Sequence, residues 1–436
     1  MSQRDGDLTG AHPEEGDRHA VRMDGSDDDE LDQPTSKATE HITAMDVRKG
    51  KDMQGIPWNV MPTTRDKYRQ SRLQGYANFE NVPNSGRLSE KACHSYAFQI
   101  SYIPGRVEHL FRPSKHLMWR CWCRNACLQR KANSTTSFST ARVEEFSVGN
   151  NKARCVSYVK LFCASLKHHR NYYEGFYRTP VSTLAVKHNL LVTGGFHGEI
   201  ICKFLDRQGV SYCCKTTNDD DGITNSLEIF EKPSGSLHFL ASNNDCGLRD
   251  FDMEKFRICN HFHFAWPVNH TSLSPDGKLA AIVGDSPDGL LIDANSGKTV
   301  HKLHGHLDYS FASAWNPDGR TFATGNQDKT CRVWDVRNLS RSVVVLGGNI
   351  GAVRSIRYTP DGKFMAMTEP ADFIHIFDVE SGYSRKQELD FFGEIAGISF
   401  SPDTEALFVG VHDRFFSCCL LQFNRRRFYS YLDSTL

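Results

Sequence analysis

Side chains that could bind a metal ion occur in this sequence, but their spacing does not suit that role. Cys121, Cys123 and Cys127 lie close together, and thiolates bind zinc strongly. Structural zinc sites usually have two residues between paired cysteines, whereas only one separates Cys121 from Cys123, and no second pair follows at a suitable distance. We therefore expect these cysteines to be reduced thiols, with no metal ion.

The histidines do not indicate a metal site either. His261 and His263 alternate along the chain, and His301, His304 and His306 form a second group. No carboxylate stands near the first pair, so we expect surface or core histidines. The sequence also lacks clustered carboxylates and a recognisable pair of nucleophile and base. We therefore predict a protein that is not an enzyme, with no cofactor and no small-molecule substrate.

Composition excludes further classes of protein. The 436 residues carry 52 Lys and Arg against 52 Asp and Glu, and 39% of them are hydrophobic. No stretch approaches the roughly 20 consecutive apolar residues that a membrane helix needs, and the polar N-terminus lacks a signal-peptide core. The fourteen cysteines are irregularly spaced, which is typical of an intracellular chain. We expect a soluble protein of the cytoplasm, the nucleus or both, without membrane contact.

Charge is unevenly distributed along the chain. Residues 1–50 hold thirteen acidic and six basic side chains, a net charge of 6 − 13 = −7, and no aromatic residue. This composition predicts a disordered acidic tail. Residues 51–90 mix apolar and polar residues, which suggests a short arm that docks on the main domain. Residues 91–170 carry fourteen basic and three acidic side chains, a net charge of 14 − 3 = +11.

That basic segment, 91–170, raises the question of nucleic-acid binding. Basic side chains with interspersed aromatics can bind RNA by releasing counterions and stacking bases. No regular basic stripe accompanies them here, so we favour a solvated stretch and do not expect a nucleic acid as partner.

A turn motif repeats through the second half of the chain. Pro-Asp-Gly or a close variant begins at Pro233, Pro275, Pro317, Pro360 and Pro402, with spacings of 42, 42, 43 and 42 residues. Proline presets the backbone of such a turn, aspartate bonds back to it, and glycine accepts a positive φ. Periods of about 40–45 residues are typical of the four-stranded blades of a β-propeller.

A second motif has the same period. Short alternating runs typical of half-buried strands flank each turn. An apolar residue followed by Asp then closes each unit, at Asp206, Asp252, Asp293, Asp335 and Asp378, spaced 46, 41, 42 and 43 residues apart. Two motifs with one period argue against a helical solenoid or an α/β fold.

One unit carries the signature of a known family. Gly305-His306, twenty-seven further residues and then Trp334-Asp335 identify a WD40 repeat. Residues 172–436 resemble a plant and fungal group of intracellular, transducin-like WD-repeat proteins, largely uncharacterised, and residues 49–85 resemble the arm that precedes their propeller. The resemblance implies an all-β WD40 propeller over residues 171–436 that serves as a scaffold for other proteins.

In blades of this family a buried hydrogen-bond chain joins four polar side chains. The matching positions here are His306, Thr324, Asp328 and Trp334. A network in which every buried polar group has a partner stiffens a blade at little cost in stability. We find the full set in this blade alone.

The turns indicate about six blades, whereas seven is the commonest number in the family. The missing blade should come from residues 91–170, which lack the paired turn and closing motifs. That segment is a degenerate blade, a basic insertion or a misassigned exon. A propeller that is short of a blade would leave a sheet edge unpaired.

Two functional hypotheses follow from the resemblance. The first is a non-catalytic scaffold, in intracellular signalling or regulation, that binds unidentified partner proteins at the propeller's rim through Leu307, Tyr309 and Gln327. The second is a substrate receptor that binds the adaptor of cullin-4 ubiquitin ligases. Its basis is Trp334-Asp335-Val336-Arg337, a Trp-Asp-any-Arg box in which Arg337 would be the contact residue. Arg337 could equally pair with a neighbouring acidic residue.

Overall fold

The computed structural model describes residues 54, 56, 58–76, 80–85, 110–121, 181–218, 221–412 and 418–425. The chain divides into two compact units, Met1–Ala38 and Thr39–Leu436. All described residues belong to the second unit, and the following account concerns that unit alone. The acidic tail expected over residues 1–50 lies outside the described part, as do residues 91–109 and 122–170 of the basic segment.

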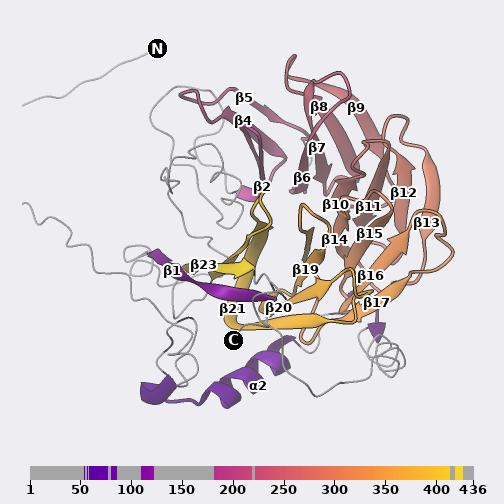
Figure 1. Ribbon diagram of the computed structural model, residues 1–436. Coiled ribbons are helices and arrows are strands. Elements are labelled where there is room, and N and C mark those ends of the chain that lie inside the picture. The colour runs from indigo at the N-terminus through magenta and orange to yellow at the C-terminus, as the bar shows by residue number, and fades with distance from the viewer. Residues whose placement is uncertain are drawn as a thin grey trace, which may run out of the picture. The chain divides into compact units, whose positions relative to one another are not determined.

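The described part consists almost entirely of antiparallel strands (Figure 1). Four sheets have four strands each. The first sheet contains β2(Val181–Lys187), β3(Leu190–Gly195), β4(Glu199–Phe204) and β5(Tyr212–Lys215), and the second contains β6(Thr224–Glu231), β7(Leu237–Asn243), β8(Gly247–Asp252) and β9(Arg257–His263). The third contains β10(Val268–Leu273), β11(Leu279–Gly284), β12(Gly289–Asp293) and β13(Thr299–Leu303). The fourth contains β14(Ser310–Trp315), β15(Thr321–Asn326), β16(Thr330–Asp335) and β17(Val344–Gly347).

The fifth sheet has seven strands and contains two blades. It comprises β18(Ser355–Tyr358), β19(Phe364–Thr368), β20(Ala371–Asp378), β21(Lys386–Phe400), β22(Ala406–His412), β23(Cys418–Arg425) and β1(Phe111–Cys121). The first half of β21 pairs with β20 as the outer strand of one blade, and its second half pairs with β22 as the inner strand of the next. The described residues therefore form six four-stranded groups.

These groups are arranged as a β-propeller (Figure 1). The first strand of each blade contacts the first strand of the next, in the order β2, β6, β10, β14 and β18. Each blade is a twisted antiparallel meander, so its two faces pack against its two neighbours. The expected fold class, a WD40-type all-β propeller, is confirmed.

The repeated turns join the first and second strands in five of the six blades. Their third residue has a positive φ every time, from 67° to 83°, and four of the five residues are glycines: Gly235, Gly277, Gly319, Gly362 and Thr404. Glycine adopts this backbone conformation without a steric penalty. Thr404, with φ of 67°, pays that penalty as a β-branched residue.

Successive blades are linked by hydrogen bonds between their inner strands. A register shift follows the first residue of β2, β6 and β10. The residue at each shift donates to the carbonyl oxygen of the first residue in the next inner strand. The bonds are Ser182 Oγ to Thr224 at 2.6 Å, Asn225 Nδ2 to Val268 at 3.0 Å, and Asn269 Nδ2 to Ser310 at 3.1 Å. In these three blades one polar side chain thus ties the inner strand to its neighbour.

Strand β1 comes from the basic segment and completes the last blade. It runs antiparallel to β23, with Phe111 opposite Arg425 and Cys121 opposite Cys418. Part of residues 91–170 therefore belongs to the propeller, although this stretch carries neither of the repeated motifs. The outer strand of the C-terminal blade is therefore β1, which comes from the N-terminal side of the chain.

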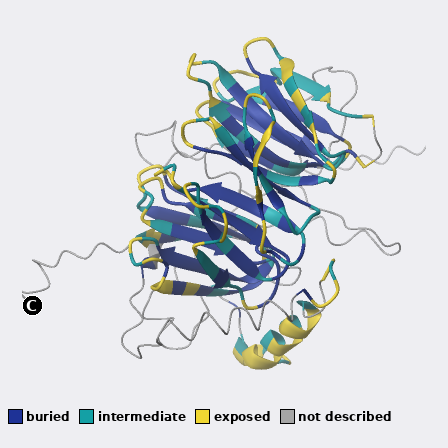
Figure 2. Cartoon of the chain, turned by 90° about the vertical axis from the view of Figure 1, so that its right-hand side faces the viewer, coloured by how far each residue is buried: buried dark blue, intermediate teal, exposed yellow. Residues whose placement is uncertain are grey.

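The arm contributes two short helices, the 3₁₀ helix η1(Trp58–Val60) and the α-helix α2(Arg65–Tyr76). Thr64 precedes α2 as its N-cap, and its hydroxyl accepts a hydrogen bond from the backbone N–H of Lys67. The strands are mostly buried, whereas α2 is largely exposed (Figure 2). Among the described residues, no helix has the length and hydrophobicity needed to cross a membrane.

Candidate interaction surface

Two kinds of loop meet at one end of each blade. One leads from the outer strand to the next inner strand, and the other joins the second and third strands. In the blade β14–β17 these loops are residues 304–309 and 327–329. We call this end of the propeller the top face, and the end that carries the Pro-Asp-Gly turns the bottom face.

The four polar side chains singled out in the sequence lie together in this blade. His306 Nε2 is 2.8 Å from the hydroxyl of Thr324, which also accepts a hydrogen bond of 2.9 Å from Trp334 Nε1. His306 Nδ1 lies 3.3 Å from a carboxylate oxygen of Asp328. Thr324 is on the second strand and Trp334 on the third, so the chain joins the loops to the body of the blade.

Asp328 is the point where both top-face loops are held. It accepts hydrogen bonds from the backbone N–H groups of Leu307 at 3.0 Å and Thr330 at 2.9 Å. Burial alone would raise the pKa of Asp328, but the neighbouring His306 and these hydrogen bonds hold it below its ordinary value. A buried carboxylate with this many partners fixes the geometry of the loops.

The next blade uses a different buried network at the same place. Glu369 accepts hydrogen bonds from three successive backbone N–H groups, residues 349–351, at 2.5 to 2.8 Å. Its carboxylate also lies 2.8 Å from His375 Nε2, and the opposite ring nitrogen lies 3.3 Å from Glu388. The hydrogen bond with His375 lowers the pKa of Glu388 to about 2. Burial opposes protonation of His375, but the two carboxylates raise its pKa overall.

In the blade β6–β9, Phe251 precedes the closing Asp252 as Trp334 precedes Asp335, and its ring has no N–H donor. Asp245 of this blade pairs with Arg249, 2.6 Å away, instead of with a histidine. Burial opposes ionisation of Asp245, but hydrogen bonds from Arg249 lower its pKa overall. The sequence pattern did not reveal either replacement network, because Glu369, His375 and Arg249 occupy positions that the family signature does not specify.

Leu307 and Tyr309, the candidate contact residues, lie in the first top-face loop and are half-buried. The backbone of this loop is tied to the second loop, since Gln327 N–H donates to the carbonyl of Tyr309 at 2.8 Å. The two side chains are therefore presented from a fixed backbone.

Gln327 differs from the expectation. Only 7% of its surface is exposed, so it does not project from the rim as an anchor. It is the residue before Asp328, and the hydrogen bonds that hold the two loops together also draw it inward. Of the three candidate residues, Leu307 and Tyr309 are the more exposed.

Arg337 follows the third strand on the bottom face. Its side chain is 62% exposed and forms an ion pair of 2.5 Å with Asp335. Hydrogen bonds from Arg337 lower the pKa of Asp335 to about 2. The structure thus contains the local pairing that the sequence left open as an alternative, while the guanidinium remains accessible.

The arm lies against the top face at Asp308, beside the candidate residues. The fully buried carboxylate of Asp308 accepts hydrogen bonds from the backbone of Asn81 at 3.0 Å and Val82 at 3.2 Å, and from the hydroxyl of Ser85 at 2.5 Å. Residues 80–85 therefore form part of the surface around Leu307 and Tyr309. The repeat pattern gave no signal for this contact, which joins residues more than 200 positions apart.

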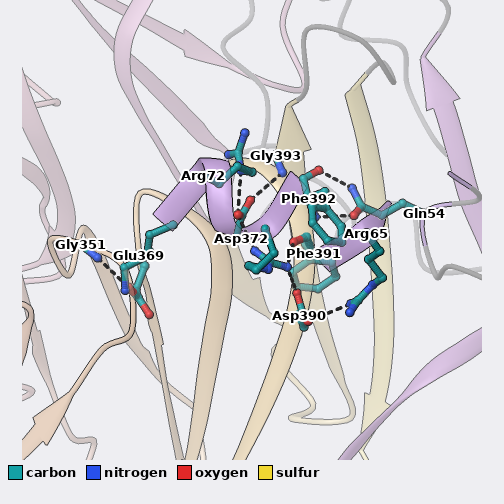
Figure 3. Close-up of polar contacts among 12 residues, drawn as sticks. Gln54, Arg65, Arg72, Gly351, Glu369, Asp372, Asp390, Phe391, Phe392 and Gly393 are labelled. Atoms are coloured by element: carbon teal, nitrogen blue, oxygen red, sulfur yellow. Dashed lines mark hydrogen bonds and ion pairs between the residues drawn. The ribbon is translucent and has the colours of Figure 1, made fainter. Parts of the chain in front are cut away.

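The other end of the arm binds the blade that contains β20 and β21 (Figure 3). Asp372 Oδ2 pairs with Arg69 at 2.5 Å and with Arg72 at 2.7 Å, and Asp390 pairs with Arg65 at 2.8 Å. The other interactions are centred on the ring of Phe392. Trp58 and Tyr68 pack on that ring at 4.7 and 5.6 Å between centroids, and the side-chain amide of Gln54 bonds to its backbone.

The described residues contain no group of three or more His, Cys, Asp or Glu placed to hold a metal ion. The exposed pair His261 and His263 lies on the outer strand β9. Cys121 ends β1, and the two other cysteines of that group lie outside the described part.

Comparison with known proteins identifies one repeat of the chain. The model of the family described as "WD domain, G-beta repeat" matches residues 297–335, which cover the blade with the buried four-residue network from the end of the preceding blade to Asp335. The chain therefore contains a WD repeat. The matched stretch includes His306 and Trp334, so the family match and the hydrogen-bond chain concern the same residues.

Curated relatives of this WD-repeat protein support the assignment. An uncharacterized protein of Schizosaccharomyces pombe is 26% identical over 43% of this chain and 60% of its own length. An uncharacterized WD repeat-containing protein of Synechocystis is 33% identical over 22% of this chain and 28% of its own length. A guanine nucleotide-binding protein subunit beta of Oryza sativa subsp. japonica is 31% identical over 33% of this chain and 41% of its own length. The chain spans less than two thirds of each relative.

Proposed function

We propose that this WD-repeat protein is a non-catalytic scaffold that binds partner proteins on its top face, in signalling or regulation in the cytoplasm or the nucleus. One observation carries the proposal: Leu307 and Tyr309 stand half-buried in a loop whose backbone is fixed by Asp328. The WD40 propeller and the relationship to guanine nucleotide-binding protein beta subunits support a protein-interaction scaffold in general.

The rigidity of this surface favours binding. Association costs free energy when loops and side chains must be ordered at the interface. Here the hydrogen bonds of Asp328 and Asp308 already order the loop and the adjoining arm segment, 80–85. A tyrosine and a leucine on such a preformed surface have the chemistry of interface anchors, since aromatic residues often dominate binding energy.

The test is affinity purification with a tagged full-length chain in which Leu307→Ser and Tyr309→Ala are combined. Neither change removes the backbone N–H that Asp328 or Asp308 accepts, so the melting temperature should stay within a few degrees of wild type. We expect partners recovered by wild type to be lost. The matched control combines Val300→Ser and Val343→Ser, two exposed apolar residues outside the top-face loops, and should recover the same partners as wild type. Equal recovery by the top-face variant would refute the site.

A second candidate function is substrate recognition for a cullin-4 ubiquitin ligase. The supporting observation is that Arg337 is 62% exposed on the bottom face, at the end of the Trp-Asp-any-Arg box. An adaptor would have to compete with Asp335 for the guanidinium. Co-purification with the cullin-4 adaptor, abolished by Arg337→Ala and retained by Arg341→Ala, is the expected result. Absence of the adaptor from wild-type preparations would end this hypothesis.

A further inference from the structure

Helix α2 is attached to the propeller through the ends of long side chains. Arg65, Arg69 and Arg72 lie at positions i, i+4 and i+7, so they project from one face of the helix. No residue of α2 is buried. Apolar packing of a helical face, which normally holds a helix on a domain, is therefore replaced by contacts of the three guanidinium groups and of Tyr68.

The propeller side of this contact is an acidic and aromatic site, which we call the arm dock and define as Asp372, Asp390 and Phe392. The Asp372 side chain is fully buried beneath Arg69 and Arg72. The guanidinium of Arg69 lies 4.1 Å from the centroid of the Phe392 ring, within the range of a cation–π interaction.

The arm dock is formed by the propeller's own strands. Asp372 lies in β20 at a register shift and has a φ of 71°. Its second carboxylate oxygen accepts the backbone N–H of Gly393 from β21 at 2.9 Å (Figure 3). The carboxylate is thus oriented by the sheet, and a preorganised site of this kind binds an incoming cation at low entropic cost.

Helix α2, in contrast, has little stability of its own. A twelve-residue helix is marginal in water when it stands alone. The Arg65–Asp390 pair is 46% and 35% exposed, and exposed ion pairs contribute only about 0–1 kcal/mol. A contact made of a rigid acidic site and a weakly self-sustaining basic helix is one that a competing helix of the same chemistry can take over.

We propose that the arm dock is a binding site for an arginine-bearing helix of a partner protein, and that α2 occupies this site in cis until such a helix replaces it. This inference rests on the scaffold function proposed above. The partner helix carries arginines spaced i, i+4 and i+7, with an aromatic residue between the first two, because that is the pattern of Arg65, Tyr68, Arg69 and Arg72.

Displacing α2 would also change the neighbouring surface. Phe392 would lose the cover of Trp58 and Tyr68, leaving an aromatic ring beside two carboxylates. The partner's arginines would neutralise the carboxylates and its aromatic residue would cover the ring, so the exchange replaces each contact with one of the same kind.

The experiment uses the full-length chain with Arg69→Glu and Arg72→Glu, which repel α2 from Asp372 and Asp390. A fluorescently labelled peptide of residues 58–76 with the wild-type sequence is titrated against this variant and against wild type, and binding is followed by anisotropy. We expect the variant to bind the peptide at least ten-fold more tightly than wild type. Adding Asp372→Asn to the variant should weaken binding at least ten-fold.

Two controls separate dock binding from general charge effects. The full-length variant with Arg207→Glu and Arg341→Glu, two exposed arginines outside the dock, has the same net charge and should behave like wild type. A peptide carrying the Arg69→Glu and Arg72→Glu changes should bind none of the proteins. If the variant with Arg69→Glu and Arg72→Glu is folded but fails to bind the wild-type peptide, the proposal is wrong.

A second measurement covers the case in which the double variant does not fold. Hydrogen exchange of α2 in the wild-type chain is measured with and without excess unlabelled peptide. Faster exchange over residues 65–76 supports exchange at the dock, and unchanged exchange contradicts it. The wild-type chain could instead form a concentration-dependent dimer that the variant with Arg69→Glu and Arg72→Glu does not form. That result would identify a second copy of the chain as the occupant and would overturn the assignment to a partner protein.

These outcomes are independent of the test of the scaffold function. Partner loss in the Leu307 and Tyr309 variant concerns the rim of the blade β14–β17, whereas peptide binding concerns the dock on β20 and β21. A peptide that does not bind, together with partners that still depend on Tyr309, would refute only the exchange.

Discussion

At the scale of single residues, buried polar side chains determine where the top-face loops lie. Thr324 is central to the blade β14–β17, because its hydroxyl contacts both His306 and Trp334. Removing one partner of a buried hydrogen bond costs more than the bond contributes, since the remaining group stays out of water without a partner.

We predict that Thr324→Val lowers the free energy of unfolding by about 1–3 kcal/mol for each polar atom left without a partner. Valine has the shape of threonine, so packing is retained and the loss reports on the hydroxyl. Urea denaturation measures the change, and Thr299→Val, at an exposed position on β13, is the control. Equal stability of the Thr324→Val variant and wild type would show that the network does not stiffen the blade.

Thr404 offers a prediction in the stabilising direction. Its positive φ costs a non-glycine residue roughly 1–2 kcal/mol. Glycine would remove that cost but would lose about 0.5–1 kcal/mol through the entropy of the unfolded chain, together with the half-buried hydrogen bond from Arg425. We expect Thr404→Gly to be neutral or to raise the free energy of unfolding by up to about 1 kcal/mol. The reverse change, Gly319→Thr, should be clearly destabilising, and a destabilised Thr404→Gly variant would contradict this reading of the turns.

The buried histidine network of the neighbouring blade predicts a pH dependence. Because the pKa of Glu388 is lowered to about 2 in the folded chain, its ionised form stabilises the fold above its ordinary pKa. That contribution is lost as pH falls from about 4.5 towards 2. Glu388→Gln should therefore flatten the decline of unfolding free energy across this interval, whereas the exposed Glu254→Gln should not. Parallel curves for wild type and Glu388→Gln would exclude this role.

At the scale of elements, the arm is a second structural layer added to the blades. Its helix contacts β20 and β21, and its last described residues, 80–85, contact the loop before β14. The arm therefore spans two neighbouring blades on the top face. Ion pairs and hydrogen bonds hold both ends of the arm, and aromatic packing on Phe392 is added at the helix end.

We predict that Gln70→Pro releases α2 while the propeller stays folded. Gln70 is exposed in the middle of the helix, and a proline there costs about 3 kcal/mol or more. Limited trypsin digestion should cut rapidly after Arg72, and the melting temperature of the main transition should change by only a few degrees. Gln70→Ala is the control. A large loss of propeller stability would show that arm and blades fold as one cooperative unit.

At the scale of the whole molecule, the sequence predicted the repeat but not the contacts between distant parts of the chain. Five turns and five closing residues specify one blade each, because a period-two strand and a Pro-Asp-Gly turn are local features. The pairing of β1 with β23 and the contacts of Arg69 and Arg72 join residues about 300 positions apart, and no repeated motif marks such partners. The burial of Gln327 was not predicted either, because it depends on how two loops meet.

The central claim is that this propeller acts through its top face and the arm that lies on it. The most direct test is hydrogen exchange of the full-length chain alone and in complex with a partner recovered by affinity purification. We predict protection on binding over residues 304–309 and 326–329, with changes in exchange over residues 58–85, and none in the bottom-face turns. Protection confined to the bottom-face turns at 275–277, 317–319 and 360–362 would contradict the account.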